Sequence, residues 1–167
     1  MPSYAQLTPI GSIRSPFKGP AGTPIQPVFA GEAEGIVEVF PEYAEGLRDL
    51  DGFERIWLLY WLDRAPPARL RVVPFRDDVE HGLFATRVPC RPNPIGLSCV
   101  RLLRIERNLL TAAGVDILDG TPVLDIKPYV PQFDAFPQSR AGWLAKRGNN
   151  RTLADHRFQP DDPAVCD

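Results

Sequence analysis

The sequence predicts an all-β fold: a small closed or nearly closed β-barrel with short helical segments and Pro-rich loops. Its 167 residues match one domain, and 44% are hydrophobic, which is enough for a core. Proline accounts for 19 residues, roughly twice its average share. Because proline interrupts helix interiors and central strands, long helices are disfavoured. Seven or eight short apolar segments separated by turn residues are typical of a barrel.

The first half of the chain alternates short strands with loops. Apolar patterning predicts strands at 7–14, 35–40, 53–62 and 70–74. Residues 53–62 are apolar at successive positions, as in a strand buried on both faces. Pro41 begins a short helix that is expected to reach residue 50, since proline suits the first helical position. The loop at 15–31 is long and rich in proline, and long structured loops tend to be functional.

The second half continues in the same way and then changes character. Strands are predicted at 83–88, 95–105, 109–112, 115–118 and 122–127. After Tyr129 the alternation fades, one or two helical turns are expected at 139–147, and the last 15 or so residues are expected to be loose. We therefore divide the chain into a barrel domain, 1–135, and a C-terminal extension, 136–167, that packs on the barrel or on a dimer partner.

Composition excludes several classes of protein. No apolar run approaches the ~18–20 residues of a membrane span, and no secretory signal follows Met1, so a cytoplasmic protein with free thiols is expected. The nucleotide-binding GxGxxG and GxxxxGK[ST] patterns are missing, as is the GxSxG elbow. The two histidines do not have zinc-ligand spacing, and we predict no metal. A Cys90–His81 nucleophilic pair is conceivable, but a small buried thiol and a surface imidazole are the simpler reading.

Charge is unevenly spread along a chain whose net charge is −2. The nine basic side chains of residues 64–107 are all arginine and outnumber four acidic ones, whereas the flanking segments are acidic. A basic segment of this kind faces a polyanion or is simply a solvated surface. Arginine's planar fork suits phosphate better than lysine does.

Two short motifs stand out from the strand pattern. Residues 91–96, RPNPIG, place two prolines around an asparagine, which holds the backbone rigid without regular hydrogen bonding. Such a loop serves binding, because little entropy is lost when a ligand arrives, or it is a plain rigid turn. Residues 116–122, DILDGTP, place two carboxylates before a turn, where they bind ribose hydroxyls or an ammonium, or simply form a solvated acidic turn.

Taken together, these segments resemble the TsaA/TrmO-like (YaeB-like) family. The resemblance starts with GxIxSPF at 11–17 and continues with FATR at 84–87, RPNPIG, and DGTPVLDIKPY at 119–129. Order and spacing agree from about Leu7 to Pro131. The resemblance implies a β-barrel methyltransferase that uses S-adenosylmethionine, is generally a homodimer, and methylates N6 of N6-threonylcarbamoyladenosine at position 37 of threonine tRNA.

The resemblance also implies site residues. The implied cofactor contacts are Gln26, Pro27, Val28, Asp63, Arg64, Arg87, Leu97, Asp116, Ile117, Leu118 and Asp119. Candidates for contacts to the acceptor are Arg91, Asn93, Asp125, Lys127 and Tyr129. Asp63-Arg64 departs from the histidine and amide that relatives often have at these positions. Longer family members carry a further C-terminal domain thought to help hold tRNA, which leaves the acceptor of this chain open.

Methyl transfer from a sulfonium is an in-line displacement that needs proximity and a fitted site more than a covalent nucleophile. The acceptor N6 belongs to a urea-like group, so a general base or electrostatic help to its deprotonated form is expected. Asp63, His81 and Asp125 are candidates on chemistry alone, and the catalytic residue stays unassigned. Two alternatives remain open: the same cofactor with another RNA or a small-molecule acceptor, and a non-catalytic barrel that binds S-adenosylmethionine or RNA.

Overall fold

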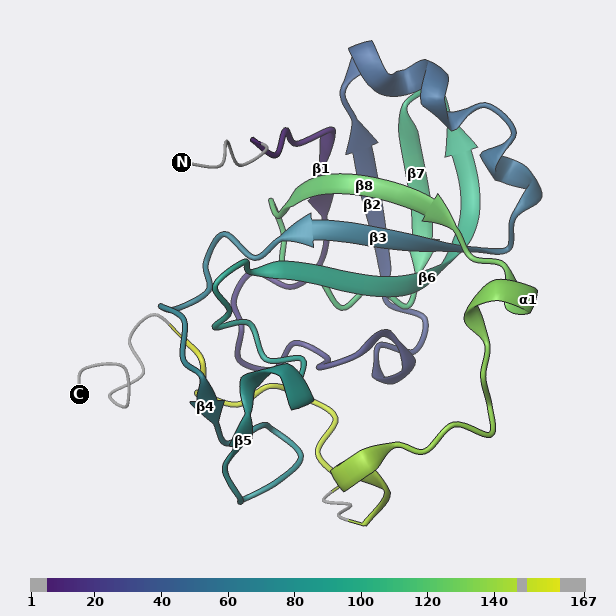
Figure 1. Ribbon diagram of the computed structural model, residues 1–167. Helices are drawn as coiled ribbons and strands as arrows, with labels where there is room; N and C mark the ends of the chain where they lie inside the picture. Colours follow the sequence, from purple (N-terminus) through teal and green to yellow (C-terminus); the bar gives the residue numbers. More distant parts are fainter. Residues whose placement is uncertain (1–5, 147–149, 160–167) are drawn as a thin grey trace.

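Six antiparallel strands close into a barrel in the order β1-β2-β7-β6-β3-β8, which confirms the predicted fold class. A computed structural model describes residues 6–146 and 150–159 (Figure 1). The barrel strands are β1 (Gly11–Arg14), β2 (Glu34–Val39), β3 (Arg55–Trp61), β6 (Ile95–Glu106), β7 (Leu109–Ala113) and β8 (Pro122–Pro128). Every ladder between them is antiparallel.

Strand alternation fills the barrel interior. On β3, Ile56, Leu58 and Tyr60 are buried, while the residues between them are partly exposed on the outer face. The register pairs Tyr60 with Gly96 and Leu58 with Ser98, so these partners share the inner face. A register shift at Leu59/Tyr60 in the β3–β8 ladder and another at Leu102/Arg104 in the β6–β7 ladder curve the sheet enough to close.

The helical segments of the described residues are short, and all but one are 3₁₀-helices. The predicted short helix after Pro41 is a 3₁₀-helix followed by a second one, and both close the end of the barrel at which β3 begins (Figure 1). The 3₁₀-helices are Pro27–Phe29, Pro41–Leu47, Leu50–Gly52, Leu83–Ala85 and Gly142–Ala145, and the α-helix is α1 (Pro131–Asp134).

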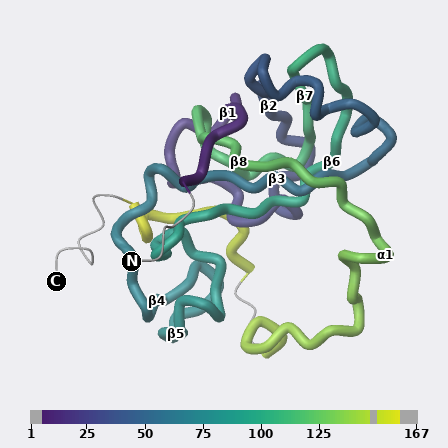
Figure 2. Tube along the Cα trace, turned by 45° about the horizontal axis from the view of Figure 1, so that its top comes forward, coloured from purple at the N-terminus to yellow at the C-terminus, as the bar shows by residue number. Residues whose placement is uncertain are grey.

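A second, smaller apolar cluster lies below the barrel. Strands β4 (Arg71–Val72) and β5 (His81–Gly82) form a separate two-stranded sheet. The side chains of Val72, Leu83, Val88, Cys90 and Phe158 pack together beside this sheet. Figure 2 shows the described C-terminal segment, in yellow, between the barrel and the small sheet of β4 and β5.

Three sequence predictions are wrong. Residues 83–88 form a 3₁₀ turn and irregular chain, because the carbonyl of Leu83 bonds within the turn to the Thr86 N–H and hydroxyl. Residues 115–118 have buried, alternating side chains but belong to no strand, since Ser15 Oγ bonds the Ile117 carbonyl. Residues 150–159 at the expected loose end are hydrogen-bonded to the rest of the fold, whereas 160–167 lie outside the described residues.

Candidate functional site

The predicted cofactor residues converge at one end of the barrel. This end is formed where β3 stops, where β6 and β8 begin, and where the chain leaves β1. Asp63 and Arg64 follow β3, Leu97 lies at the start of β6, and 116–119 precede β8. The topology of the barrel therefore brings together segments that are separated by almost 100 residues in the sequence.

A chain of polar side chains leads from the barrel interior to this end. Ser98 Oγ donates a hydrogen bond to Asp116 Oδ1 at 2.6 Å. Tyr60 Oη lies 3.0 Å from the same Oγ. Because the single Ser98 proton is used on Asp116, the Tyr60 hydroxyl donates to Ser98. Arg87 lies within electrostatic range of Asp116, and its Nη1 donates to Gln26 Oε1 at 2.8 Å.

The surroundings of this chain shift its acidities. Burial raises the pKa of Asp116 to about 6, against the opposing effects of the Ser98 hydrogen bond and the Arg87 charge. Burial and then the Asp116 charge also raise the pKa of Tyr60, which stays protonated as a donor. Asp116 itself is partly exposed, so solvent and ligands can reach it. A carboxylate that changes charge near neutrality and is open to a ligand is typical of functional sites.

Tyr60 and Ser98 were not identified from the sequence. The signal for them was the strand period: in β3 and β6 they occupy inward positions that otherwise hold apolar residues. Gly96 fixes the Tyr60 ring, because a Cβ there would lie 2.1 Å from Tyr60 Cε2. A glycine at this point lets the aromatic ring lie flat against the strand and aims its hydroxyl at Ser98.

A second polar cluster holds the acidic turn. Asp119 accepts hydrogen bonds from the Ser15 N–H at 2.9 Å and from Lys18 Nζ at 2.7 Å. These contacts lower its pKa, the Lys18 hydrogen bond contributing most. Arg64 Nη2 donates to the Asp119 carbonyl at 2.9 Å and to Thr121 Oγ1 at 3.0 Å, and Asp63 lies 3.5 Å from Arg64 Nε. The predicted residues Asp63, Arg64 and Asp119 are thus in contact with one another.

The other predicted cofactor residues sit around these two clusters. Gln26 directly precedes the 3₁₀-helix that holds Pro27 and Val28, and the Val28 side chain is 79% exposed. Leu97 is 48% exposed, on the outer face of β6, while its neighbour Ser98 points inward. The Ile117 side chain is buried in the main core, and its carbonyl accepts a hydrogen bond from Ser15 Oγ at 2.6 Å. The Leu118 carbonyl accepts one from the Thr121 N–H at 3.2 Å.

The acceptor candidates fall into two separate groups. Arg91 and Asn93 lie at the cofactor end: Arg91 Nη1 donates to the Thr86 carbonyl at 3.0 Å, and its guanidinium lies 5.8 Å from the ring centroid of Phe84. The Asn93 carbonyl accepts a hydrogen bond from the Ile95 N–H at 2.8 Å, which shapes the RPNPIG turn.

Asp125, Lys127 and Tyr129 lie farther along β8, toward the opposite end of the barrel. Lys127 Nζ is 2.8 Å from Asp125 Oδ2, an ion pair that raises the pKa of Lys127. The Tyr129 ring packs at 5.8 Å from Trp57. A cavity of about 580 Å³ at this far end is lined by Tyr43, Phe53 and Asp125, among others. It does not coincide with the polar cluster that contains Asp116.

The candidates for general base occupy three different settings. His81 Nε2 lies 2.8 Å from Asp77 Oδ2, and its ring stacks on Trp143 at 4.3 Å, away from the Asp116 cluster. Asp63 is beside Arg64, and Asp125 is at the far end. Cys90 is fully buried with a raised pKa caused by that burial, which argues against a nucleophilic thiol.

Two kinds of feature are absent from the described residues. Within 6–146 and 150–159, His, Cys, Asp and Glu side chains form no group of three or more that could hold a metal ion. In the same parts of the chain, no helix is long and apolar enough to cross a membrane.

The comparisons with known proteins decide the family. Residues 12–135 match the family model of the tRNA-methyltransferase O N-terminal domain. The chain belongs to this family. A probable S-adenosyl-L-methionine-binding protein of Pyrococcus abyssi is 55% identical over 160 residues, which cover 95% of this chain and 87% of that protein. The tRNA (adenine(37)-N6)-methyltransferase of Escherichia coli is 35% identical over 156 residues, covering 84% of this chain and 64% of that protein.

Solved structures agree with this family. The crystal structure of TrmO from Pseudomonas aeruginosa superposes with a TM-score of 0.73 at 42% identity, covering 84% of this chain and 63% of that one. The tRNA-methyltransferase O domain of this chain therefore spans less than two thirds of the E. coli and P. aeruginosa proteins. It spans most of the Pyrococcus abyssi relative.

Proposed function

We propose that this protein methylates tRNA with S-adenosylmethionine, on N6 of adenosine 37 in its threonylcarbamoyl form. The observation that carries the proposal is the Arg87–Asp116 cluster, a partly exposed carboxylate with a pKa near 6 beside an arginine. It lies inside the matched region 12–135, and the E. coli relative named for this adenosine covers most of the same chain.

The residues at this end of the barrel suit the chemistry of the cofactor. S-adenosylmethionine supplies an electrophilic methyl group on a sulfonium and also presents an ammonium, a carboxylate, ribose hydroxyls and an adenine. Carboxylates at Asp63, Asp116 and Asp119 suit the cationic and hydroxyl groups, and the guanidinium of Arg87 suits the carboxylate. The remaining proposed contacts, some polar and some apolar, are Gln26, Pro27, Val28, Arg64, Leu97, Ile117 and Leu118.

We assign to Asp116 the role of the general base that accepts the N6 proton. N6 of a urea-like group is a weak nucleophile, so its proton must leave as the bond to the methyl carbon forms. Asp116 accepts that proton on its carboxylate, and its pKa near 6 allows it to be ionised at neutral pH and still be basic enough to do so. The hydrogen bond from Ser98, itself oriented by Tyr60, fixes the direction of the carboxylate. Asp63, His81 and Asp125 are not needed for this step.

The acceptor is proposed to approach from the side of the RPNPIG turn. Arg91 and Asn93 lie there, and exposed Arg87 is close by, so anticodon phosphates and a threonyl carboxylate meet positive charge. Asp125, Lys127 and Tyr129 lie on β8 and just beyond it, on the opposite side of β3 from β6 and its Leu97. We propose that they touch a more distant part of the RNA.

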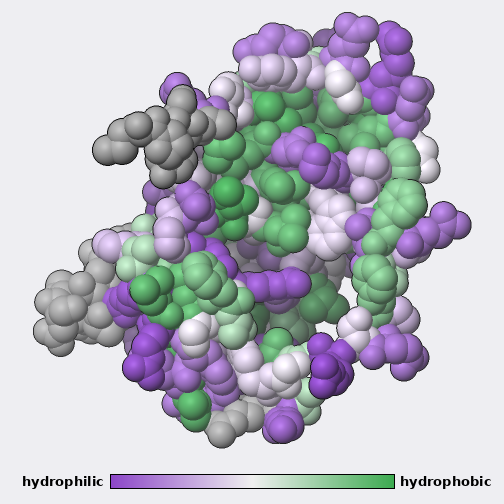
Figure 3. All heavy atoms as spheres, viewed as in Figure 1, coloured by the Kyte–Doolittle hydropathy of each residue, from purple (hydrophilic) through white to green (hydrophobic). Residues whose placement is uncertain are grey.

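A homodimer is also part of the proposal. The outer face of β3, β6 and β8 carries apolar side chains, and Figure 3 shows them gathered in the middle of that face. Ile95 and Leu97 on this face are 38% and 48% exposed. A contiguous exposed apolar surface favours association with another chain. Light scattering should give the mass of two chains.

We place this enzyme of tRNA in the cytoplasm. A methylation assay with defined RNA tests the proposal. Threonine tRNA with and without the threonylcarbamoyl group is incubated with the protein, S-adenosylmethionine and a chelator, and the nucleosides are analysed by mass spectrometry. Methylation of the modified tRNA alone supports the proposal. Methylation of another RNA or of a small molecule would support the same fold with a different acceptor. Cofactor binding without any methylation would support a binding protein.

A further inference from the structure

The C-terminal segment pairs with the loop that carries Gln26. Leu153 forms an antiparallel bridge with Pro24. On either side of the bridge, the Ile25 N–H donates to the Thr152 carbonyl at 3.0 Å and the Ala154 N–H donates to the Thr23 carbonyl at 2.8 Å. The residue that directly precedes Gln26 is therefore held by the backbone of the tail.

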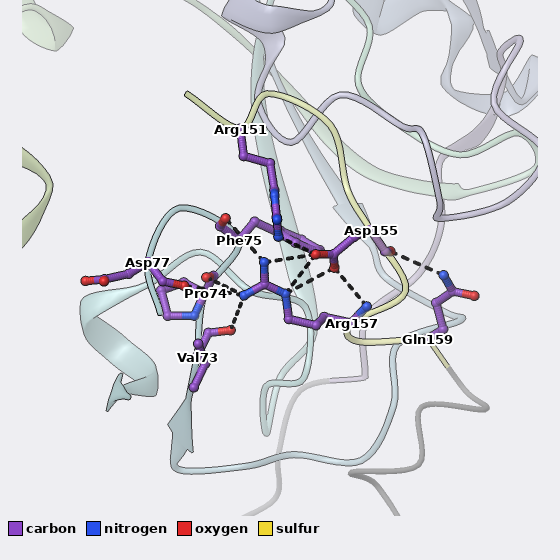
Figure 4. Close-up of polar contacts among 8 residues, drawn as sticks. All are labelled: Val73, Pro74, Phe75, Asp77, Arg151, Asp155, Arg157 and Gln159. Carbon is purple, nitrogen blue, oxygen red and sulfur yellow. Dashed lines mark hydrogen bonds and ion pairs between the residues drawn. The ribbon is translucent and has the colours of Figure 1, made fainter. Parts of the chain in front are cut away.

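Arg157 anchors the same segment to the smaller apolar cluster. Its guanidinium donates to the carbonyl of Pro74 at 2.9 Å and reaches the carbonyls of Val73, Phe75 and Asp77 at 3.4–3.5 Å (Figure 4). Asp155 accepts from Arg157 at 2.9–3.1 Å. Burial raises the pKa of Asp155, but the Arg157 hydrogen bonds and charge outweigh burial and lower it to about 2. This anchor is therefore ionised at any pH at which the protein works.

The extension also holds the other side of the Gln26–Arg87 contact. Trp143 Nε1 donates to the Ala85 carbonyl at 2.8 Å, two residues before Arg87. Phe158 packs on Val88, one residue after Arg87, in the smaller apolar cluster. Gln26 and Arg87, whose side chains are joined by the 2.8 Å hydrogen bond, thus each lie next to residues that the extension holds in place.

From these contacts we infer that the described part of the extension, Trp143 and residues 150–158, acts as a positioning element for the cofactor site, with Arg157 as its anchoring residue. The inference rests on the proposed function, and it concerns a segment that the family domain match, 12–135, does not include. A loop that is held in its bound conformation loses less entropy when a ligand binds. The tail therefore raises affinity for S-adenosylmethionine without touching it.

Two proline substitutions in the full chain provide a matched test. Pro24 and Leu153 face each other in the bridge, but the hydrogen bonds on either side of them are donated by Ile25 and Ala154. Pro24 has no N–H, and the N–H of Leu153 takes no part in the bridge. Leu153→Pro should therefore keep both flanking hydrogen bonds, and its side chain is already 46% exposed. Ala154→Pro removes the N–H that bonds the Thr23 carbonyl. We expect Ala154→Pro to weaken cofactor binding in calorimetry by about two- to tenfold, the usual effect of one hydrogen bond, and Leu153→Pro to change it less than twofold.

Arg157 supplies a second, independent variant. Arg157→Gln should raise the KM for S-adenosylmethionine with little change in kcat, because a positioning contact acts on binding rather than on the transition state. Arg157→Lys should recover part of the loss, since the ammonium keeps the ion pair with Asp155 but cannot span several carbonyls.

The effect of the cofactor on the tail can be measured by hydrogen exchange, and a merely structural role of the tail would leave that exchange unchanged. If the tail and the cofactor site are coupled, saturating S-adenosylmethionine must slow hydrogen exchange at the Ile25 and Ala154 amides of the unmodified protein. Unchanged exchange there, or equal cofactor affinities in the Ala154→Pro and Leu153→Pro proteins, would overturn the inference while leaving the proposed function intact. Failure of the unmodified protein to bind S-adenosylmethionine would remove both.

Discussion

Replacing Asp116 with asparagine should make the protein more stable and inactive at neutral pH. Asparagine keeps the shape of the side chain and can still accept the Ser98 hydrogen bond, but it carries no charge and cannot take a proton. Burial raises the pKa of Asp116 from 3.8 to about 6, so ionising this group costs the folded state more than the unfolded chain. At about 1.4 kcal/mol per pKa unit this penalty is about 3 kcal/mol, and the residual solvent contact of Asp116 reduces it to about 1–3 kcal/mol.

The sign of the effect follows from the raised pKa. Below pH 4 Asp116 is protonated in both states and contributes nothing. Between about pH 4 and pH 6 the unfolded chain loses this proton while the folded protein keeps it, so the Asp116 contribution to stability falls as pH rises, and above pH 6 it stays constant. The advantage of Asp116→Asn over the parent should grow over the same interval.

Urea denaturation of both proteins at pH 4 and pH 8 measures this difference. The free energy of unfolding of Asp116→Asn should exceed that of the parent by about 1–3 kcal/mol more at pH 8 than at pH 4. In parallel, kcat should fall by about 10²–10⁴-fold, the usual contribution of a general base, and the parent rate should rise through pH 6. The reasoning would be refuted if the stability difference were the same at both pH values. Ser98→Ala, which removes the oriented donor, is the companion variant.

Three further changes have distinct expected outcomes. Arg87→Ala should weaken cofactor binding or turnover about ten- to a hundredfold, because a charged hydrogen bond is lost. Arg107 is exposed at the far end of the barrel, and Arg107→Ala should leave both cofactor affinity and turnover unchanged in the same calorimetry and rate assays. Gly96→Ala forces a Cβ into the Tyr60 ring and should lower stability by about 1–3 kcal/mol in a thermal melt, with loss of activity; an unchanged melt would show that the ring moves freely. Affinity for tRNA should fall about ten- to a hundredfold from 50 to 200 mM salt if three or four phosphates are contacted, and a flat salt series would contradict RNA contact by the arginines.

The sequence was informative wherever side-chain alternation coincided with a hydrogen-bonded ladder. The long strand β6 and its partner β3 were predicted almost to their ends, because β6 alternates, β3 is a continuous apolar run, and both have a neighbour on each side. Residues 115–118 alternate equally well, yet Val115 and Ile117 are buried in the main core without belonging to a ladder. Periodicity reports burial, and burial alone does not make a strand.

The arrangement of the site was only partly predictable. The motifs located Asp116 and Arg87, but the electrostatic interaction between them depends on how the chain between β3 and β6 folds against the barrel. That region is irregular, and it is held by bonds to main-chain carbonyls such as those from Arg157 and Trp143. Bonds to carbonyls leave no mark in a residue pattern, because every residue has a carbonyl. The same reason explains why the extension looked loose in the sequence.

The arginine-rich segment shows a third kind of limit. The nine arginines of 64–107 are the only basic residues of that segment, but Arg101 and Arg104 lie on β6, which runs from the cofactor end toward the far end of the barrel (Figure 1). There they pair with Glu32 and Glu106. Arg64, Arg87 and Arg91 remain near the cofactor end. A single basic patch in the sequence is therefore two separate groups in the fold.

The short seam between β1 and β8 determines when the barrel can be completed during synthesis. Among the described residues, the ladder between these strands has two register pairs, Gly11↔Val123 and Ser12↔Pro122, whose members are separated by about 110 residues of chain. Until β8 leaves the ribosome, the outer edges of β1 and β3 both lack a neighbour. Such open edges invite pairing with other chains, and non-local closure of this kind is slow. Nascent chains that stall before Pro122 should therefore be the species most in need of a chaperone.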